Sequence, residues 1–174
     1  MIIDFHTHMF PDKIAARTID FLSKTGGDMN PFTDGTWKGL KESTKQAGID
    51  HSIVLPIATR PGQFHTINEF ATHFQEGTLI SFGSLHPESE NYKEELRQIQ
   101  DMGMKGIKLH PDYQDMYFDD IRYEHIVDTA SELGLITVVH AGADPKCPKD
   151  VHCTPKMARK LLDDVKPEKL VLAH

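Results

Sequence analysis

The pair His6 and His8 is the first feature of the sequence that could do chemistry. Residues 2–5 before it form a short apolar run typical of a buried β-strand. Because side chains two residues apart on a strand point to the same face, both imidazoles are expected to face one side. Two neutral imidazoles held in this way suit a zinc-like cation, which binds histidine nitrogens at about 2.0–2.1 Å. The pair therefore predicts part of a metal site at the carboxyl end of this strand.

Further histidines end other apolar runs of the same character. His140 and His174 each close such a run, His110 follows another, and His86 comes shortly after a fourth. In a barrel of parallel strands all carboxyl ends meet at one face, where active sites gather. Any one of these histidines taken alone is more often structural. Because histidine is the commonest metal ligand, however, the set predicts a metal or catalytic site at that face.

Lys108 stands two residues before His110 on the expected strand, so its side chain is predicted to face the same site. A free ammonium there would bind a substrate carboxylate. The ion, Lys108 and Arg60 together would make the site cationic, which favours a small substrate that bears a carboxylate. We assign Lys108, His110 and His86 to substrate binding.

Six apolar, β-branched runs are spaced as strands that alternate with helices. Four of them start at residues 52, 79, 106 and 135, at intervals of 27, 27 and 29 residues, which suits repeated βα units with right-handed crossovers. A flavodoxin-like open sheet would alternate similarly, but a Gly-rich phosphate loop normally follows its first strand. The sequence therefore predicts an α/β fold, (β/α)8 TIM-barrel-like, with six of eight βα units present. The expected strands are 2–5, 52–57, 79–83, 106–109, 135–139 and 170–173.

The expected helices have recognisable ends, and two more helices are expected at 36–46 and 65–75. The side chains predicted to cap helices are those of Asn91 or Ser89, Asp119 or Asp120, and Thr154, and the residues predicted to end them are Gly103, Gly134 and Pro167.

Residues 9–51 form an insertion, with an extra helix at about 11–24 and a Gly-, Pro- and Asp-rich loop at 26–35. Insertions after a strand lie on the catalytic face of a barrel, so this one, with Phe32 and Trp37, is a candidate pocket wall. A plain cover for the barrel end is the equally favoured alternative.

The composition describes one globular domain over residues 1–174. A net charge of -7 without a basic run argues against nucleic acids and anionic membranes as partners. No membrane-length apolar stretch or leader pattern is present, so a cytoplasmic protein with a small-molecule substrate is expected. Cys147, His152 and Cys153 share one loop at a spacing that matches no structural zinc pattern, and pocket-lining thiols are favoured there over a second metal site.

Four motifs together resemble the amidohydrolase superfamily. They are His6-Thr7-His8, Gly106-Ile107-Lys108-Leu109-His110-Pro111, His140-Ala141-Gly142 and Leu172-Ala173-His174. The similarity is closest to the branch of TIM-barrel metal-dependent hydrolases related to aminocarboxymuconate semialdehyde decarboxylase, and it runs from residue 2 to residue 174. The motifs are specific for the superfamily and unspecific for substrate.

The resemblance implies that His6, His8 and His140 bind one divalent ion, which we expect to be Zn²⁺. It implies a catalytic role for His174 beside the metal-bound water, which it would orient, or as a group that stabilises a developing oxyanion. An aspartate after strand eight normally completes such a site as ligand and base.

Two relatives suggest other roles for the lysine and for one histidine. In binuclear members a carboxylated lysine on strand four bridges two ions, and we favour a free amine at Lys108 over that state. The segment around His86 resembles the His-Pro motif of TatD-type deoxyribonucleases, but Lys108 and His110 stand where those relatives carry a glutamate.

A zinc-like ion lowers the pKa of a bound water to about 7, which makes a nucleophile for a carbonyl carbon. The sequence therefore predicts a metal-dependent hydrolase that acts on an amide, ester or lactone of a small, carboxylate-bearing molecule. A metal-dependent decarboxylase or hydratase of a small organic acid is the first alternative. A TatD-like nuclease and a catalytically incomplete metal-binding fragment are the others.

The length is short for a closed eight-stranded barrel, which typically takes about 250 residues. Six strands would leave the first and last with unpaired edges and an exposed apolar interior. We therefore expect a fragment of a longer protein that lacks about 80–110 residues, including strands seven and eight and the aspartate. A homodimer that lends strands across its interface is left open.

Overall fold

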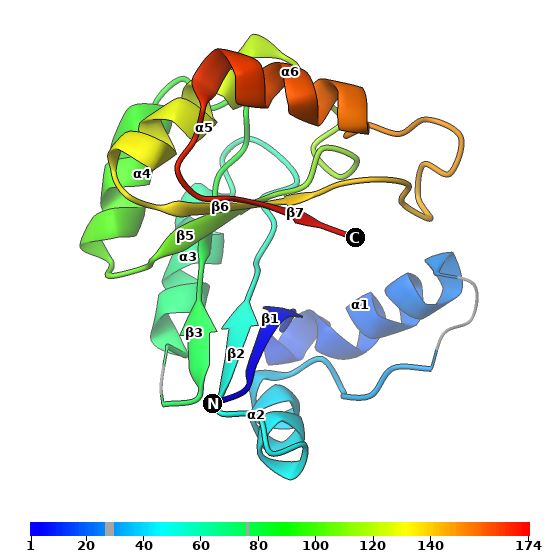
Figure 1. Cartoon of the computed structure of the whole chain (residues 1–174). Helices are drawn as coiled ribbons and strands as arrows, with labels where there is room; N and C mark the ends of the chain where they lie inside the picture. The colour runs from blue at the N-terminus through cyan, green and yellow to red at the C-terminus, as the bar shows by residue number, and fades with distance from the viewer. Residues whose placement is uncertain (27–29, 76) are drawn as a thin grey trace.

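Short strands and helices alternate along the chain in a computed structural model that describes residues 1–26, 30–75 and 77–174 (Figure 1). Most of the helices lie along one side of the strands, as the βα spacing predicts, whereas the helix at Asp12–Thr25 extends away beyond the first strand. The elements of the described residues are β1 (Ile3–Thr7), α1 (Asp12–Thr25), α2 (Trp37–Gln46), β2 (His51–Val54), α3 (Phe64–His73), β3 (Leu79–Ser81), β4 (Gly83–Ser84), α4 (Tyr92–Asp101), β5 (Gly106–Leu109), α5 (Ile121–Glu132), β6 (Ile136–His140), α6 (Pro155–Val165) and β7 (Leu170–Ala173).

Every strand pair is parallel, in the orders β1-β2-β3 and β4-β5-β6-β7. The single strand expected at 79–83 is wrong in detail, because Phe82 interrupts it. Its N–H donates to Val54 O at 2.9 Å, and the chain changes partner there from β2 to β5. The two ladders therefore follow one another through Phe82, and the chain forms a parallel α/β partial barrel.

Side chains along each strand alternate between two faces of the sheet. One face is packed against the helices (the helix face), and the other carries a separate cluster formed by strand residues and their flanking segments (the strand face). Ile53, Leu55, Phe82 and Val138 form a cluster to which β7 adds Val171, and no residue of a helix belongs to it. A larger cluster lies between β4–β6 and helices α4, α5 and α6, and a smaller one lies under α2 and α3. The alternation along each strand thus leaves one face free of helices, as in the interior of a barrel.

Gly106 is required at the start of β5 by close approach of its neighbours. A Cβ at this position would lie 2.4 Å from Ile136 O and 2.4 Å from Phe82 Cε2. Neither contact can be relieved by moving a flexible side-chain end, because one atom is backbone and the other belongs to a buried ring. The β5–β6 pairing therefore depends on the absence of a side chain here.

The helix caps agree largely with the sequence pattern. The side chains of Thr36, Asp120 and Thr154 accept backbone N–H groups at the starts of α2, α5 and α6. Pro155 occupies the first turn of α6. Asn91 does stand at the N-cap of α4, but its side chain makes no capping hydrogen bond, so the predicted role of that side chain is wrong.

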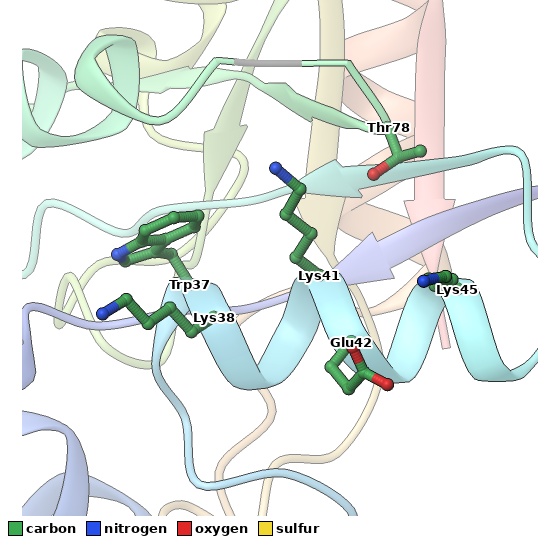
Figure 2. Close-up of a pocket in the computed structure, with 6 residues that line it drawn as sticks. All are labelled: Trp37, Lys38, Lys41, Glu42, Lys45 and Thr78. Carbon is green, nitrogen blue, oxygen red and sulfur yellow. The ribbon is translucent and has the colours of Figure 1, made fainter.

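The insertion after β1 holds α1 and α2, and part of its predicted loop, residues 27–29, lies outside the described residues. Phe32 is 99% exposed, and Trp37 stacks on Phe74 in the cluster under α2 and α3. Figure 2 shows the hollow along α2, whose wall includes Thr78 at the amino end of β3. Trp37 therefore lines a hollow on the helix face and does not lie at the carboxyl ends of the strands as expected, while the role of the insertion as a wall of the catalytic pocket stays a prediction.

The outer strands of the described sheet order are β1 and β7. Three apolar side chains on these strands are open to solvent, with exposures of 44% for Ile3, 37% for Phe5 and 45% for Leu172. Phe5 nevertheless touches Phe82 of the strand face at a ring separation of 5.9 Å. Among the described residues, no helix is long and apolar enough to cross a bilayer.

Candidate metal centre

Four imidazole rings gather at the carboxyl ends of β1, β6 and β7. His6 and His8 lie at the end of β1, their ring centroids 5.0 Å apart. His140 is the last residue of β6 and His174 directly follows β7. The ring of His174 lies 4.8 Å from that of His6 and 4.7 Å from that of His140, so it joins the two strand ends.

The nitrogens of His6 and His8 are arranged like two ligands of one ion. Their Nε2 atoms are 3.1 Å apart. Two nitrogens bound to zinc at tetrahedral angles would be about 3.3 Å apart, given bonds of about 2.0–2.1 Å. His8 Nδ1 lies 2.8 Å from Leu55 O, and only a protonated Nδ1 can donate to that carbonyl. The lone pair of neutral His8 is therefore on Nε2, the tautomer that a carbonyl-bound metal ligand adopts.

His140 brings a buried nitrogen that lacks a hydrogen bond. Among the described residues its Nε2 has no hydrogen-bond partner, although Asp144 Oδ2 lies 3.5 Å away. A buried polar atom left unsatisfied costs about 1–3 kcal/mol. A cation would remove that cost, so the donor chemistry of His6, His8 and His140 fits a divalent ion such as zinc or manganese.

The electrostatics of the cluster keep its histidines neutral. Burial first, and then the charge of Lys108, lower the pKa of His6 to about 3. The side chain of His8 is exposed to solvent on one side. Burial of the rest of the ring, and then the charge of Lys108, nevertheless lower its pKa to about 4. Burial also lowers the pKa of His140, against the opposing effect of Asp144. At neutral pH these rings are therefore unprotonated, the state that a metal ligand requires.

Lys108 lies on the strand face with the histidines. It pairs in register with Val138, which belongs to the strand-face cluster, and its side chain is fully buried. Its Nζ has no hydrogen-bond partner within the described part of the chain, and burial lowers the pKa of this amine to about 8. A buried ammonium without a partner costs free energy. An anion bound beside the histidine rings would therefore account for the position of Lys108.

His110 lies against His140 in a stack of flat rings. Its centroid is 4.1 Å from that of His140 and 4.1 Å from that of Tyr113. Burial first, then His140 and Lys108, lower its pKa to about 2. The backbone N–H of Tyr113 donates to His110 Nδ1, so the proton of the neutral ring is on Nε2, 3.8 Å from Asp144 Oδ2. The ring thus has a hydrogen-bond donor to offer.

Asp144 is the residue of this site that the sequence reasoning missed. Its side chain is buried, with 5% exposure. Its Oδ2 lies 3.8 Å from His110 Nε2 and 3.5 Å from His140 Nε2. One possible ligand atom from each of these three residues lies within 4.8 Å of the other two. The available signal was its place four residues after His140, in the loop that leaves β6. Because Asp144 lies in a loop and does not end a strand, the pattern of strand-ending histidines did not indicate it.

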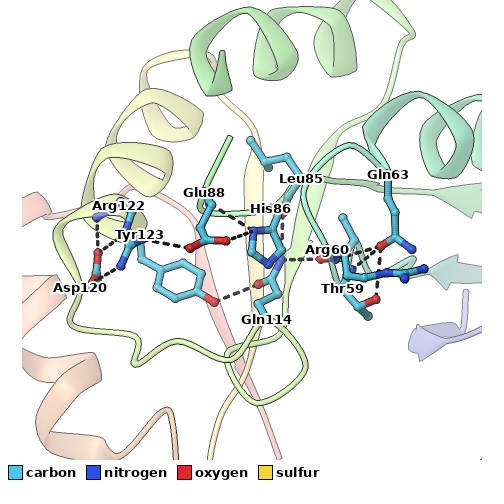
Figure 3. Close-up of polar contacts among 11 residues, drawn as sticks. Thr59, Arg60, Gln63, Leu85, His86, Glu88, Gln114, Asp120, Arg122 and Tyr123 are labelled. Carbon is cyan, nitrogen blue, oxygen red and sulfur yellow. Dashed lines mark hydrogen bonds and ion pairs between the residues drawn. The ribbon is translucent and has the colours of Figure 1, made fainter. Parts of the chain in front are cut away.

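His86 lies in a different network, shown in Figure 3. Its Nδ1 accepts the Glu88 N–H at 3.2 Å, and none of its described contacts reaches His6, His8 or His140. The structure therefore brings Lys108 and His110 to the four rings, but it does not bring His86 to them. The predicted role of His86 in substrate binding gains no support from its contacts.

Gln114 is the hub of the network in Figure 3. Its Nε2 donates to Ala58 O and Leu85 O, both at 2.9 Å. Its Oε1 accepts from the His110 N–H at 2.9 Å and from the Tyr123 hydroxyl at 3.0 Å. The amide thus uses all four of its hydrogen-bonding positions. It joins the segments that follow β2, β4 and β5 to helix α5.

Family comparison agrees with this geometry. A model of the amidohydrolase family, Amidohydro_2, matches residues 3–174. The chain therefore belongs to the amidohydrolase family. A search of curated proteins found no match.

Solved structures with the same fold include enzymes of two reaction types. A probable 2-pyrone-4,6-dicarboxylic acid hydrolase from Acinetobacter baumannii is 15% identical, with a TM-score of 0.60. IDCase from Metarhizium anisopliae is 16% identical, with a TM-score of 0.69. A 5-carboxyvanillate decarboxylase from Novosphingobium aromaticivorans, complexed with manganese and a nitrobenzoic acid, is 15% identical, with a TM-score of 0.60.

These matches cover much of this chain and less of the others. They span 99% of this chain for the hydrolase and for IDCase, and 92% for the decarboxylase. Of the matched chains they span 58%, 65% and 55%, respectively. At these identities the similarity shows a shared fold. This chain spans less than two thirds of the length of the matched chains.

Proposed function

We propose that this chain carries the metal centre of an enzyme that acts on a small, carboxylate-bearing substrate. His6, His8 and His140 would hold one divalent ion, which we propose to be Zn²⁺. When bound, such an ion polarises a substrate oxygen and lowers the pKa of a water molecule. The geometry that supports this is the pair of Nε2 atoms 3.1 Å apart, together with the unsatisfied nitrogen of His140.

Lys108 carries the inference about the substrate. Its buried Nζ has no partner among the described residues, and with a pKa of about 8 it is mostly protonated at neutral pH. A carboxylate bound there would supply the missing partner and neutralise a buried charge. We propose a free amine at Lys108 for this reason, because a carboxylated lysine would repel such a substrate.

His110 and His174 would complete the binding of the reacting group. The proton on His110 Nε2 is available to a substrate oxygen, since Nδ1 is already an acceptor for the Tyr113 N–H. His174 lies against both His6 and His140, from where it would stabilise negative charge that develops on the substrate.

Hydrolysis of an amide, ester or lactone is the reaction that we propose first. Decarboxylation of a small organic acid is the second candidate, supported by the fold shared with 5-carboxyvanillate decarboxylase. Both reactions require a bound carboxylate or carbonyl beside an ion and a cation, so the histidines and Lys108 serve either. Product analysis distinguishes them.

The test is to load the protein with Zn²⁺ or Mn²⁺ and assay two probes. The probes are 2-pyrone-4,6-dicarboxylate for lactone hydrolysis and 5-carboxyvanillate for release of CO₂. Lys108→Met is expected to raise KM about 10-fold or more, since a hydrogen bond to a charged group contributes about 1.5–3 kcal/mol. The exposed Lys105, three residues earlier, gives the control Lys105→Met, which should leave KM unchanged.

Two results would count against the proposal. Equal KM values for the two lysine variants would remove Lys108 from the substrate site. Retention of the ion without turnover of either probe would favour metal binding without catalysis.

A further inference from the structure

A second set of metal-type donors lies beside the centre described above. Asp112 follows β5, two residues after His110, and Cys147 and His152 belong to the loop of residues 141–154 between β6 and α6. One carboxylate oxygen of Asp112, one nitrogen of His152 and the sulfur of Cys147 lie within 4.8 Å of one another. We propose that these three side chains bind a second divalent ion of the zinc type.

The buried carboxylate of Asp112 is the observation that points to a ligand. Asp112 is 0% exposed, and its Oδ1 lies 3.0 Å from His152 Nδ1. Its Oδ2 is also buried, but has no hydrogen-bond partner among the described residues. A buried carboxylate oxygen left without a partner costs more free energy than a neutral polar group left unsatisfied in the same place. A cation bound at Oδ2 would remove that cost.

The charges around the sulfur favour a cation as the missing partner. Burial, and the nearby carboxylates of Asp112, Asp144 and Asp150, raise the pKa of the Cys147 thiol, while Lys146 acts in the opposite direction. Of the charged groups that act on this sulfur, three are carboxylates and one is an ammonium, although the loop of residues 141–154 itself, which also contains Lys149, is balanced in charge. The Lys146 ammonium donates to the Asp112 carbonyl oxygen at 2.9 Å, and the described residues show no ion pair between it and the Asp112 carboxylate.

The backbone holds the donor-bearing segments in place. The Gly142 N–H donates to Cys153 O at 2.9 Å, which closes the loop at its base. The Phe118 N–H donates to His152 O at 2.8 Å, which ties the loop to the segment after β5. The His152 ring is also stacked on Tyr117, at 4.8 Å between centroids. The donors therefore come from two segments that already contact one another.

The donor types select the ion. One oxygen, one imidazole nitrogen and one sulfur suit zinc and its cobalt substitute, whereas magnesium and calcium prefer oxygen ligands alone. Three protein donors leave one position of a tetrahedral ion for water. On binding, the Cys147 sulfur gives up its proton to solvent and His152 binds as neutral imidazole. The ion would join the segments after β5 and β6, which also carry His110 and Asp144.

Cobalt titration tests the site, because a thiolate bound to Co²⁺ gives a near-ultraviolet charge-transfer band that histidine ligands do not give. The metal-free protein titrated with Co²⁺ is expected to show this band. Cys147→Ser should abolish it, while Cys153→Ala should keep it, because Cys153 is packed in the apolar cluster under α6. The double variant His6→Ala, His8→Ala should also keep the band, which separates this site from the first centre.

A second measurement covers a Cys147 variant that does not fold. In the unaltered protein, Zn²⁺ should slow alkylation of Cys147 at least about 10-fold, with the modified peptide identified by mass spectrometry, while Mg²⁺ should not. Absence of the cobalt band, persistence of the band in Cys147→Ser, or alkylation at the same rate with and without Zn²⁺ would each overturn the proposal.

Discussion

Replacing Lys108 with methionine is expected to stabilise the metal-free protein near pH 7, although the same change should weaken substrate binding. The Lys108 side chain is fully buried, and burial lowers its pKa from 10.5 to about 8. One pKa unit corresponds to about 1.4 kcal/mol, so the charged amine costs the folded state about 3 kcal/mol. Methionine is similar in length and carries no charge, and its imperfect fit should cost less than about 1.5 kcal/mol.

The sign of the pH dependence follows from the lowered pKa. Below about pH 8 the amine is charged in the folded and the unfolded chain, and the whole cost is present. As the pH rises from about 8 to 10.5, the folded chain loses the proton first, so the cost disappears. Other groups that titrate in this range, such as Cys153 with a pKa raised to about 12 by burial, are the same in both proteins and cancel in the difference.

Urea unfolding in the presence of a chelator measures this difference. At about pH 7 the Lys108→Met variant should be more stable than the unaltered protein by about 1.5–3 kcal/mol, and the gap should close toward about pH 10. The control Lys105→Met should stay within about 0.5 kcal/mol throughout, because that residue is exposed. A less stable Lys108→Met variant at about pH 7, or a gap that does not change with pH, would refute the reasoning.

Three other changes have expected outcomes. The double variant His6→Ala, His8→Ala should lose the first ion, since two of its three proposed ligands are gone; elemental analysis after dialysis checks this, and full retention would contradict the site. Metal-free protein should lose stability as the pH falls from about 6.5 toward 3, because the unfolded chain takes up protons that the folded His6, with its pKa of about 3, does not; unfolding at several acid pH values measures it, and a flat profile would count against it. Gly106→Ala should cost about 1–3 kcal/mol, because its Cβ would lie 2.4 Å from Ile136 O; a thermal melt checks this, and an unchanged Tm would show that β5 and β6 can separate.

The order of the elements and the gathering of histidine rings at one end of the strands were predictable because both follow from local patterns. Strand-ending histidines such as His6 and His140 needed only the rule that parallel strands end at one face. The caps at Asp120 and Thr154 were equally local, since each depends on residues within one turn.

The features that the sequence did not reveal depend on contacts between distant segments. The break at Phe82 arises where one strand changes partner from β2 to β5, and no residue type marks that point. Trp37 was expected at the pocket, but it packs on Phe74, which is far away in sequence. Asp144 was missed because its importance depends on how the loop after β6 folds back toward His110.

The amide of Gln114 has a consequence for how this scaffold can diversify. Because its four hydrogen bonds tie the segments after β2, β4 and β5 to one another, a change in any one of these segments disturbs the other two. The insertion after β1 and the loop of residues 141–154 form none of these four bonds. Substitutions and changes of length should therefore be tolerated more readily in those two segments than in the framework around Gln114.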